Sequence, residues 1–134
     1  MADATKTMFN FTKLLVDDLE RTADFYKTVC GLTEQQRVQS SITGRAISEI
    51  IFNPPYQGAA TFVLLKFVDA PKPTNDEVIL GFITDDVDAF MQRAEAAGGK
   101  VQTAPVAQPE HGVKVGFCTD VEGHLIEVVE LLNQ

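Results

Sequence analysis

The chain repeats itself once, and this repeat constrains its fold more than any other feature. A shift of 68 positions places the acidic pair Asp17-Asp18 on Asp85-Asp86, and it places Gly31 on Gly99. Each copy holds an extended apolar run, the acidic pair, an amphipathic stretch and a glycine: FTKLLVDDLERTADFYKTVCG and ILGFITDDVDAFMQRAEAAGG. Two copies are too few for a solenoid, which needs at least three repeats. The repeat therefore predicts two similar modules, and ligand pockets commonly lie where modules meet.

The spacing of apolar residues predicts the same order of elements in both halves. In the first half we expect a strand over 9–16, a helix capped by Asp18 and ended by Gly31, and strands over 33–40, 45–52 and 61–68. In the second half we expect a strand over 77–84, a helix capped by Asp86 and ended by Gly98-Gly99, and strands over KVQTAPVA, VKVGFCT and HLIEVVEL. Each half is thus β-α-β-β-β. The position of the acidic pairs between strand and helix favours capping over paired-carboxylate catalysis.

The segment APKPTND separates the two halves. Two prolines within four residues cannot continue a strand ladder. We therefore expect an N-terminal tail over 1–8, a first βαβββ module over 9–68, a linker over 69–76 and a second module over 77–134.

Charge and composition exclude several classes of function. Eleven basic against nineteen acidic residues give a net charge of −8, which disfavours nucleic acid and anionic membranes as partners. No apolar run approaches the length of a membrane span, and the first residues lack the pattern of a secretory signal. We expect a cytoplasmic protein in which Cys30 and Cys118 are free and packed as small apolar side chains.

Three motifs carry a likeness to a known family. They are V-x-D-L-E-R-x-x-x-F-Y from Val16, F-x-x-x-D-V-D-A from Phe82 and D-V-E-G-H-L-I-E-V from Asp120. Together with the repeat, they resemble the vicinal-oxygen-chelate superfamily, which includes glyoxalase I, bleomycin-binding proteins and extradiol dioxygenases. The resemblance covers residues 9–131. It implies an α+β fold in which two βαβββ modules form a curved mixed sheet around a cavity, and it implies a homodimer.

The resemblance also implies where a metal would be held. Metal-dependent members supply two ligands from each module, on its first and last strands. The matching positions here are Phe11 in the first strand, Leu64 or Leu65 in the fourth, Ile79 in the fifth and Glu127 in the last. Only Glu127 has a donor atom, and a divalent cation needs about four to six donors. We therefore expect no metal and no other cofactor.

The resemblance implies that Phe11 faces the cavity, and alternation along the strands then predicts which other side chains share its face. The cavity-facing set is Phe11, Lys13 and Leu15 in the first strand, Ile79, Gly81 and Ile83 in the fifth, and Leu125, Glu127 and Val129 in the last. Lys13 and Glu127 are the ionisable members of this apolar set and the candidate catalytic pair. One alternative is structural: an internal salt bridge, or a Lys13 side chain that extends to the solvated rim of the cavity. The other is a site where Lys13 binds a ligand oxygen and Glu127 acts as countercharge or base. Gly81 would leave room for a ligand.

Other polar residues are less informative. We interpret His124, which follows Gly123 at the start of the last strand, as a residue of a surface turn. We interpret His111 as a solvent-exposed loop residue, and the alternative for His111 is an acid or base at the cavity rim. Further candidates for the cavity border are Glu49, Arg45, Tyr56 and Phe117. The direction of their side chains stays open, because the type of the turns before them is unknown.

Three functions remain open. The first is a metal-free binding protein of the glyoxalase and bleomycin-resistance type, which sequesters an unidentified small organic molecule in an apolar cavity. The second is a glyoxalase-like lyase or isomerase (or a hydrolase) that transfers protons through Lys13, Glu127 or His111. The third is a structural or regulatory module, and the missing metal ligands are the one observation that supports it. The missing metal ligands favour binding, whereas a Lys/Glu pair in an apolar wall favours catalysis.

Overall fold

The computed structural model describes residues 9–71 and 78–132, and within them eight strands and two α-helices follow one another in the predicted order. Contacts divide the chain into two compact units. The first holds Met1–Leu19 and Leu32–Lys72, and the second holds Glu20–Gly31 and Pro73–Gln134. The helix α1 (Leu19–Cys30) therefore belongs almost entirely to the second unit. The predicted division into modules at residues 69–76 stays a prediction, since residues 72–77 and the tail 1–8 lie outside the described residues.

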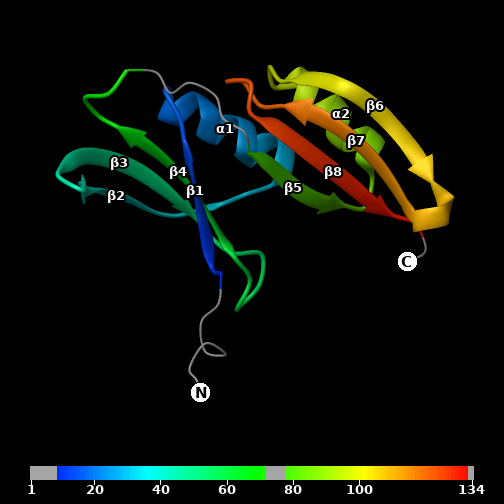
Figure 1. The fold of residues 1–134 in the computed structure, drawn as a ribbon, viewed down its shortest axis with the longest axis horizontal. Coiled ribbons are helices and arrows are strands. Elements are labelled where there is room, and N and C mark those ends of the chain that lie inside the picture. The colour runs from blue at the N-terminus through cyan, green and yellow to red at the C-terminus, as the bar shows by residue number, and fades with distance from the viewer. Residues whose placement is uncertain (1–8, 72–77, 133–134) are drawn as a thin grey trace. The chain divides into compact units, whose positions relative to one another are not determined.

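The first unit is built on a four-stranded mixed sheet (Figure 1). Its strands lie in the order β1 (Phe11–Leu15), β4 (Thr61–Phe67), β3 (Arg45–Phe52) and β2 (Glu34–Ile42). The pair β1–β4 is parallel and the others are antiparallel. On one face, Leu14, Leu64 and Ile50 lie side by side on three neighbouring strands and are buried.

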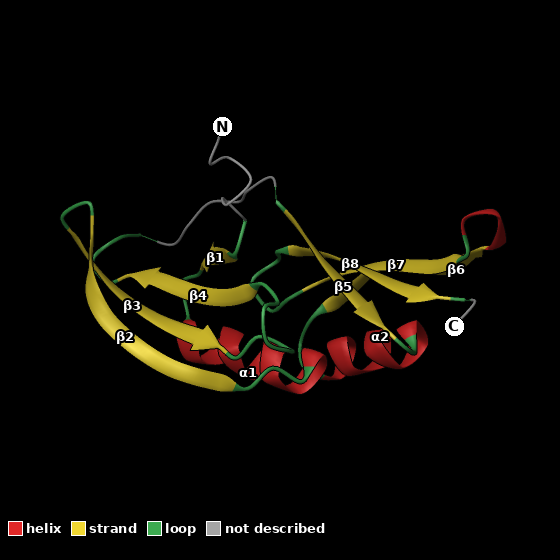
Figure 2. Cartoon of the chain, turned by 90° about the horizontal axis from the view of Figure 1, so that it is seen from below, coloured by secondary structure: helices red, strands yellow, loops and turns green. Residues whose placement is uncertain are grey.

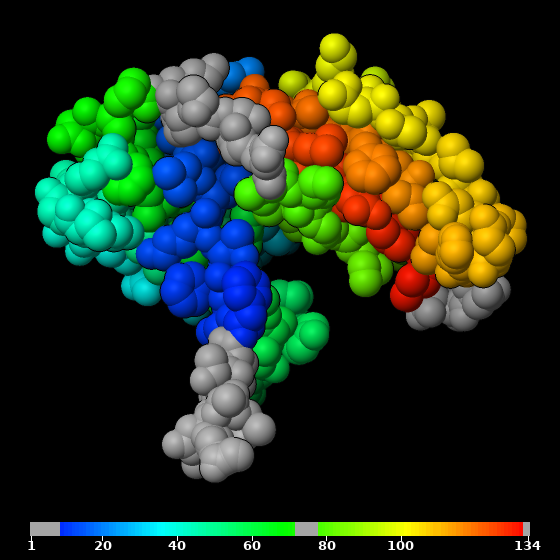
Figure 3. Space-filling view, viewed as in Figure 1, coloured from blue at the N-terminus to red at the C-terminus, as the bar shows by residue number. Residues whose placement is uncertain are grey.

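The second unit repeats this topology. Its strands lie in the order β5 (Ile79–Thr84), β8 (Leu125–Leu131), β7 (Val113–Thr119) and β6 (Lys100–Gln108), which Figure 3 shows as successive bands of green, red, orange and yellow. A short 3-10 helix, η2 (Pro109–His111), joins β6 to β7. The helix α2 (Val87–Ala96) lies along one face of the sheet (Figure 2). On the other face, Ile79 and Ile83 of β5 are exposed. Identical strand order in the two sheets confirms that the sequence repeat encodes a repeated fold.

The core of the second unit joins both helices to this sheet. Ile126 and Val128 of β8 are completely buried, and so are Ala23 and Tyr26 of α1. The Tyr26 ring stacks on Phe82 of β5 with 6.3 Å between ring centroids, and Phe82 lies equally far from Phe90 of α2. Apolar side chains at helical spacing thus meet apolar side chains at strand spacing, as the sequence pattern predicts.

Both helices begin and end where local sequence signals place them. Asp18 stands directly before α1, and the carboxylate of Asp86 accepts a hydrogen bond from the Ala89 amide at 3.0 Å, which caps α2. Gly31 follows α1 in a left-handed conformation with φ +70°, which stops the helix. One strand was predicted too short: β2 continues to Ile42, because Thr43 and Gly44 both take positive φ and form a two-residue hairpin turn. Among the described residues, neither helix is long and apolar enough to cross a membrane.

Candidate functional site

An ion pair lies on one face of the first sheet. The ammonium of Lys13 in β1 is 3.0 Å from a carboxylate oxygen of Glu49 in β3. The strand β4 runs between them, and the register pairs Lys13 with Val63 and Glu49 with Leu65. All four side chains therefore point to the same face, because residues opposite one another in a sheet share a face. The lysine reaches across β4 to bind its partner.

The surroundings of this pair are apolar. The Glu49 side chain is only 8% exposed, and Val63 and Leu65 beneath the pair are buried. The Lys13 side chain is 31% exposed, and its ammonium also lies 5.7 Å from the centre of the Phe11 ring. A nearly buried carboxylate needs a paired charge. The site thus combines a fixed carboxylate with an ammonium that still reaches solvent, beside exposed Phe11 and Leu15.

The observed partner of Lys13 is not the predicted one. The sequence indicated Glu127, which belongs to the second unit, whereas the structure pairs Lys13 with Glu49 inside the first. Glu49 was a candidate of unknown orientation, and only the antiparallel register of β3 on β4 gives its direction. Whether Lys13 and Glu127 face one cavity stays a prediction.

The remaining predicted site residues lie on the face of the second sheet opposite to Phe82, which contacts Phe90 of α2. Its register pairs Ile79 with Leu125, Gly81 with Glu127 and Ile83 with Val129, so the predicted alternation of β5 and β8 agrees with the structure. Ile79 and Ile83 are well exposed. A methyl group added at Gly81 would meet no atom within 4 Å, so there is open space beside Glu127.

A buried polar network lies in the turn before β8. One oxygen of Asp120 accepts hydrogen bonds from the amides of Glu122 and His124, at 2.8 and 3.0 Å. The other oxygen lies 2.8 Å from both the Tyr26 hydroxyl, which donates to it, and Nδ1 of His124. The network joins α1 to the D-V-E-G-H motif, so two of the three sequence motifs meet here.

The network changes the acidity of its members. Burial alone would raise the pKa of Asp120, but the hydrogen bonds from His124 and Tyr26 outweigh it and hold this pKa below its usual value. Burial, together with the Asp120 charge, raises the pKa of Tyr26 well above its usual value. The interpretation of His124 as a surface residue was wrong, because its side chain is only 13% exposed and contacts Asp120. His111 is exposed on η2, as predicted. The network is enclosed and serves to hold the turn.

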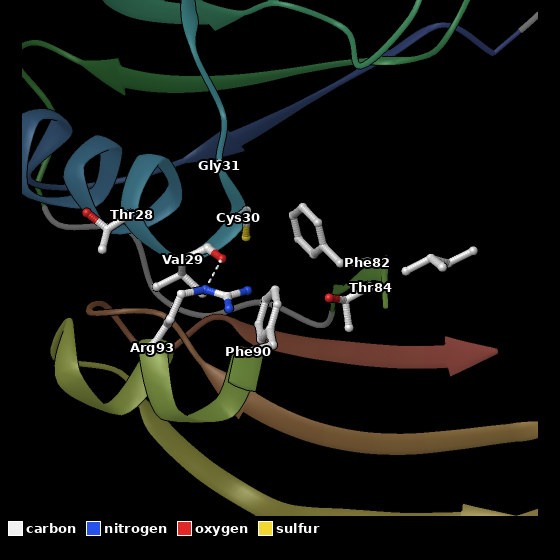
Figure 4. Close-up of a pocket in the computed structure, with 9 residues that line it drawn as sticks. Thr28, Val29, Cys30, Gly31, Phe82, Thr84, Phe90 and Arg93 are labelled. Atoms are coloured by element: carbon white, nitrogen blue, oxygen red, sulfur yellow. Dashed lines mark hydrogen bonds between the residues drawn. The ribbon is translucent and has the colours of Figure 1, made fainter. Parts of the chain in front are cut away.

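A small cavity lies on the helical side of the second unit (Figure 4). Its volume is about 250 Å³. The end of α1, the end of β5 and one face of α2 form its walls, with Phe82, Phe90 and Arg93 among the lining residues. Cys30 also lines it, and burial raises the pKa of its thiol to about 12. Both cysteines are free, as predicted, and Cys118 is buried. The sequence indicated no site here, because the lining comes from three separate elements.

Comparison with known proteins identifies the superfamily. The sequence profile of the Glyoxalase/Bleomycin resistance protein/Dioxygenase superfamily matches residues 8–128. The chain belongs to this superfamily. The comparison with curated proteins finds no match.

Solved structures of the superfamily share the architecture. A glyoxalase family protein from Bacillus cereus is 19% identical with a TM-score of 0.81, covering 98% of this chain and 100% of that one. A glyoxalase I mutant from Zea mays is 20% identical with a TM-score of 0.74, and the matched part is 90% of this chain but 45% of the maize protein. A glyoxalase/bleomycin resistance protein from Albidiferax ferrireducens is 20% identical with a TM-score of 0.66, covering 92% and 98%. At such identities the likeness concerns the fold.

The residues that the sequence prediction assigned to the metal-ligand positions of the superfamily offer few donor atoms, and their assignment to these positions stays a prediction. The register puts Leu65, not Leu64, on the face of Phe11, and it puts Ile79 and Glu127 on one face of the second sheet. Phe, Leu and Ile side chains carry no donor atom, so Glu127 would be a lone ligand. Across residues 9–71 and 78–132, no three His, Cys, Asp or Glu side chains are grouped so that they could hold a metal ion.

Proposed function

We propose that this superfamily member binds a small organic molecule that carries a carbonyl or anionic oxygen, and that Lys13 donates the hydrogen bond that holds this oxygen. The observation behind the proposal is the Lys13–Glu49 pair, whose ammonium is fixed at 3.0 Å by a nearly buried carboxylate yet stays in reach of solvent. Exposed Phe11 and Leu15 on the same face offer apolar contact to the rest of the ligand.

Turnover is the second candidate function. A lysine beside a fixed carboxylate on an apolar face has the groups for proton transfer, so Lys13 with Glu49 or Glu127 would serve a lyase or isomerase. Stoichiometric binding without product favours sequestration, and formation of product that depends on Lys13 favours catalysis. The homodimer and the cytoplasmic location stay predictions, the first of them open to light scattering.

The proposal predicts a specific result for Lys13→Met. We expect a library of metabolites and antibiotics to contain a compound that stabilises the wild type by about 2.7 kcal/mol at a concentration near 100 times its dissociation constant. Lys13→Met should lose this stabilisation while the unliganded variant stays folded. The measurement is thermal unfolding with and without the compound.

The matched control is Glu49→Gln, which keeps the shape of the side chain and leaves the ammonium without its countercharge. If the Lys13–Glu49 salt bridge is purely structural, the expected result is different. In that case either single change destabilises the protein by about 1–3 kcal/mol and neither alters ligand affinity. A Lys13→Met protein with full ligand affinity would refute the proposed role of Lys13.

The metal content is a separate prediction. Because three of the four superfamily positions hold Phe11, Leu65 and Ile79, we expect purified protein to carry far less than one Zn, Ni, Fe or Mn ion per chain. Elemental analysis of the protein, purified without chelators, measures this. One ion per chain that disappears in Glu127→Ala would show that the site forms in another way.

A further inference from the structure

We propose that the cavity between the end of α1, the end of β5 and α2 is a second binding site, separate from the Lys13 face, and that it takes a monocyclic aromatic carboxylate. Every residue that lines it belongs to the second unit, so the site needs nothing from the first. Its volume of about 250 Å³ is below the range of about 300–1,000 Å³ common for ligand sites, which favours a ligand of one ring.

Arg93 supplies the anion-binding group. Its Nε donates to the Val29 carbonyl at 3.2 Å, which holds the guanidinium against the last turn of α1 (Figure 4). This bond uses one of the five N–H groups of an arginine. Among the described residues, no acceptor is in hydrogen-bond contact with the two terminal nitrogens. A planar guanidinium with a free N–H pair suits a carboxylate, which it binds through two parallel hydrogen bonds.

Aromatic side chains supply the ring-binding walls. The guanidinium lies 5.6 Å from the centre of the Phe90 ring, and the Phe82 and Phe90 centroids are 6.3 Å apart with a tilt of 38°. Phe82 is only half-buried although it adjoins the core, so part of its ring borders the cavity. Aromatic rings favour offset or edge-to-face partners at such distances. A ligand ring can therefore continue the row formed by Tyr26, Phe82 and Phe90.

The charge of the lining agrees with an anionic ligand. Cys30, the other ionisable group of the lining, keeps its proton at neutral pH because burial raises its pKa to about 12. Arg93 is then the one charged side chain among the lining residues. A carboxylate in the cavity would meet a cation and no competing side-chain anion of the wall.

Titration with benzoate tests the proposal, and benzamide serves as the neutral comparison. In amide NMR spectra we expect benzoate to cause saturable shifts at Gly31, Thr84 and Arg93. Benzamide should bind at least about 10-fold more weakly than benzoate. Arg93→Gln should weaken benzoate binding by a similar factor. Arg93→Lys keeps the charge but lacks the paired N–H groups, so its affinity for benzoate should lie between those of the wild type and Arg93→Gln. The matched control is Arg45→Gln, because Arg45 also lies over an aromatic ring, 3.8 Å from the centre of Phe67, but does not line the cavity.

Several results would overturn the proposal. Benzoate shifts that do not saturate, that cluster around Lys13, or that are equal for Arg93→Gln and the wild type each contradict it. Equal affinity for benzamide and benzoate would show that the guanidinium takes no part. Since the benzamide comparison uses the wild-type protein, the test stands even where an Arg93 variant folds poorly. Lys13→Met should bind benzoate normally, so this site can fail or succeed independently of the Lys13 face.

Discussion

Asp120→Ala is expected to destabilise the protein by about 3–5 kcal/mol, because it removes a buried charged acceptor and with it four hydrogen bonds. Asp120 is 2% exposed and holds the Tyr26 hydroxyl, the His124 ring and two turn amides. Such a loss is a large part of the 5–15 kcal/mol typical of a domain. Urea unfolding followed by circular dichroism measures it.

The matched control is Tyr26→Phe, which removes one hydrogen bond of the network and should cost only about 1 kcal/mol. The effect also has a pH signature. Since the folded pKa of Asp120 is lowered, its contribution is fully present above the unfolded value of about 3.9 and is lost as the pH falls through the lower folded pKa. Wild-type stability should therefore drop on acidification more steeply than that of Asp120→Asn. An Asp120→Ala protein within 1 kcal/mol of wild type would contradict the structural role.

Gly99→Ala is expected to cost about 3 kcal/mol through steric overlap. Gly99 lies just before β6, where a Cβ would overlap the Thr119 carbonyl oxygen and lie 2.8 Å from the Phe25 ring and 3.1 Å from the Ala94 carbonyl oxygen. Two of these neighbours are backbone atoms that a rotamer change cannot move. The start of β6, the end of β7 or α2 must therefore shift, and equilibrium unfolding reports the cost.

Gly81→Ala is the matched control for this clash. Gly81 also lies in the second unit, but a Cβ there meets nothing within 4 Å. This change should leave stability within about 0.5–1 kcal/mol of wild type, since alanine adds only a small backbone preference. Equal effects at the two positions would mean that close packing at Gly99 is not what requires glycine. The same variant bears on function, because a loss of ligand binding in stable Gly81→Ala would extend the binding face to the second sheet.

The elements of the fold were predictable because their signals are local. Alternating apolar residues indicated the strands, helical spacing indicated α1 and α2, and Asp86 and Gly31 indicated helix ends that the structure confirms. The repeat offset aligned Phe11 with Ile79, and these residues begin equivalent strands in the two sheets. Each of these signals depends on residues a few positions apart. The hairpin turn at Thr43-Gly44 was missed because threonine rarely takes positive φ.

The site was predictable only as far as the face of a strand. Alternation correctly grouped Lys13 with Phe11 and Leu15, and Glu127 with Leu125 and Val129. It does not reveal which residue of another strand lies alongside. That neighbour depends on the strand order and on the register between strands distant in the chain, which place Glu49 across β4 from Lys13.

Short stretches of sequence predict the strands, the helix limits and the repeated topology, because hydrophobic period and helix caps are local features. Packing and register between distant segments give Lys13 its partner and form the Tyr26–Asp120–His124 network and the Arg93 cavity. Each of these includes a contact between residues 36 or more positions apart. Long-range burial and strand register select such contacts, and no local preference encodes them.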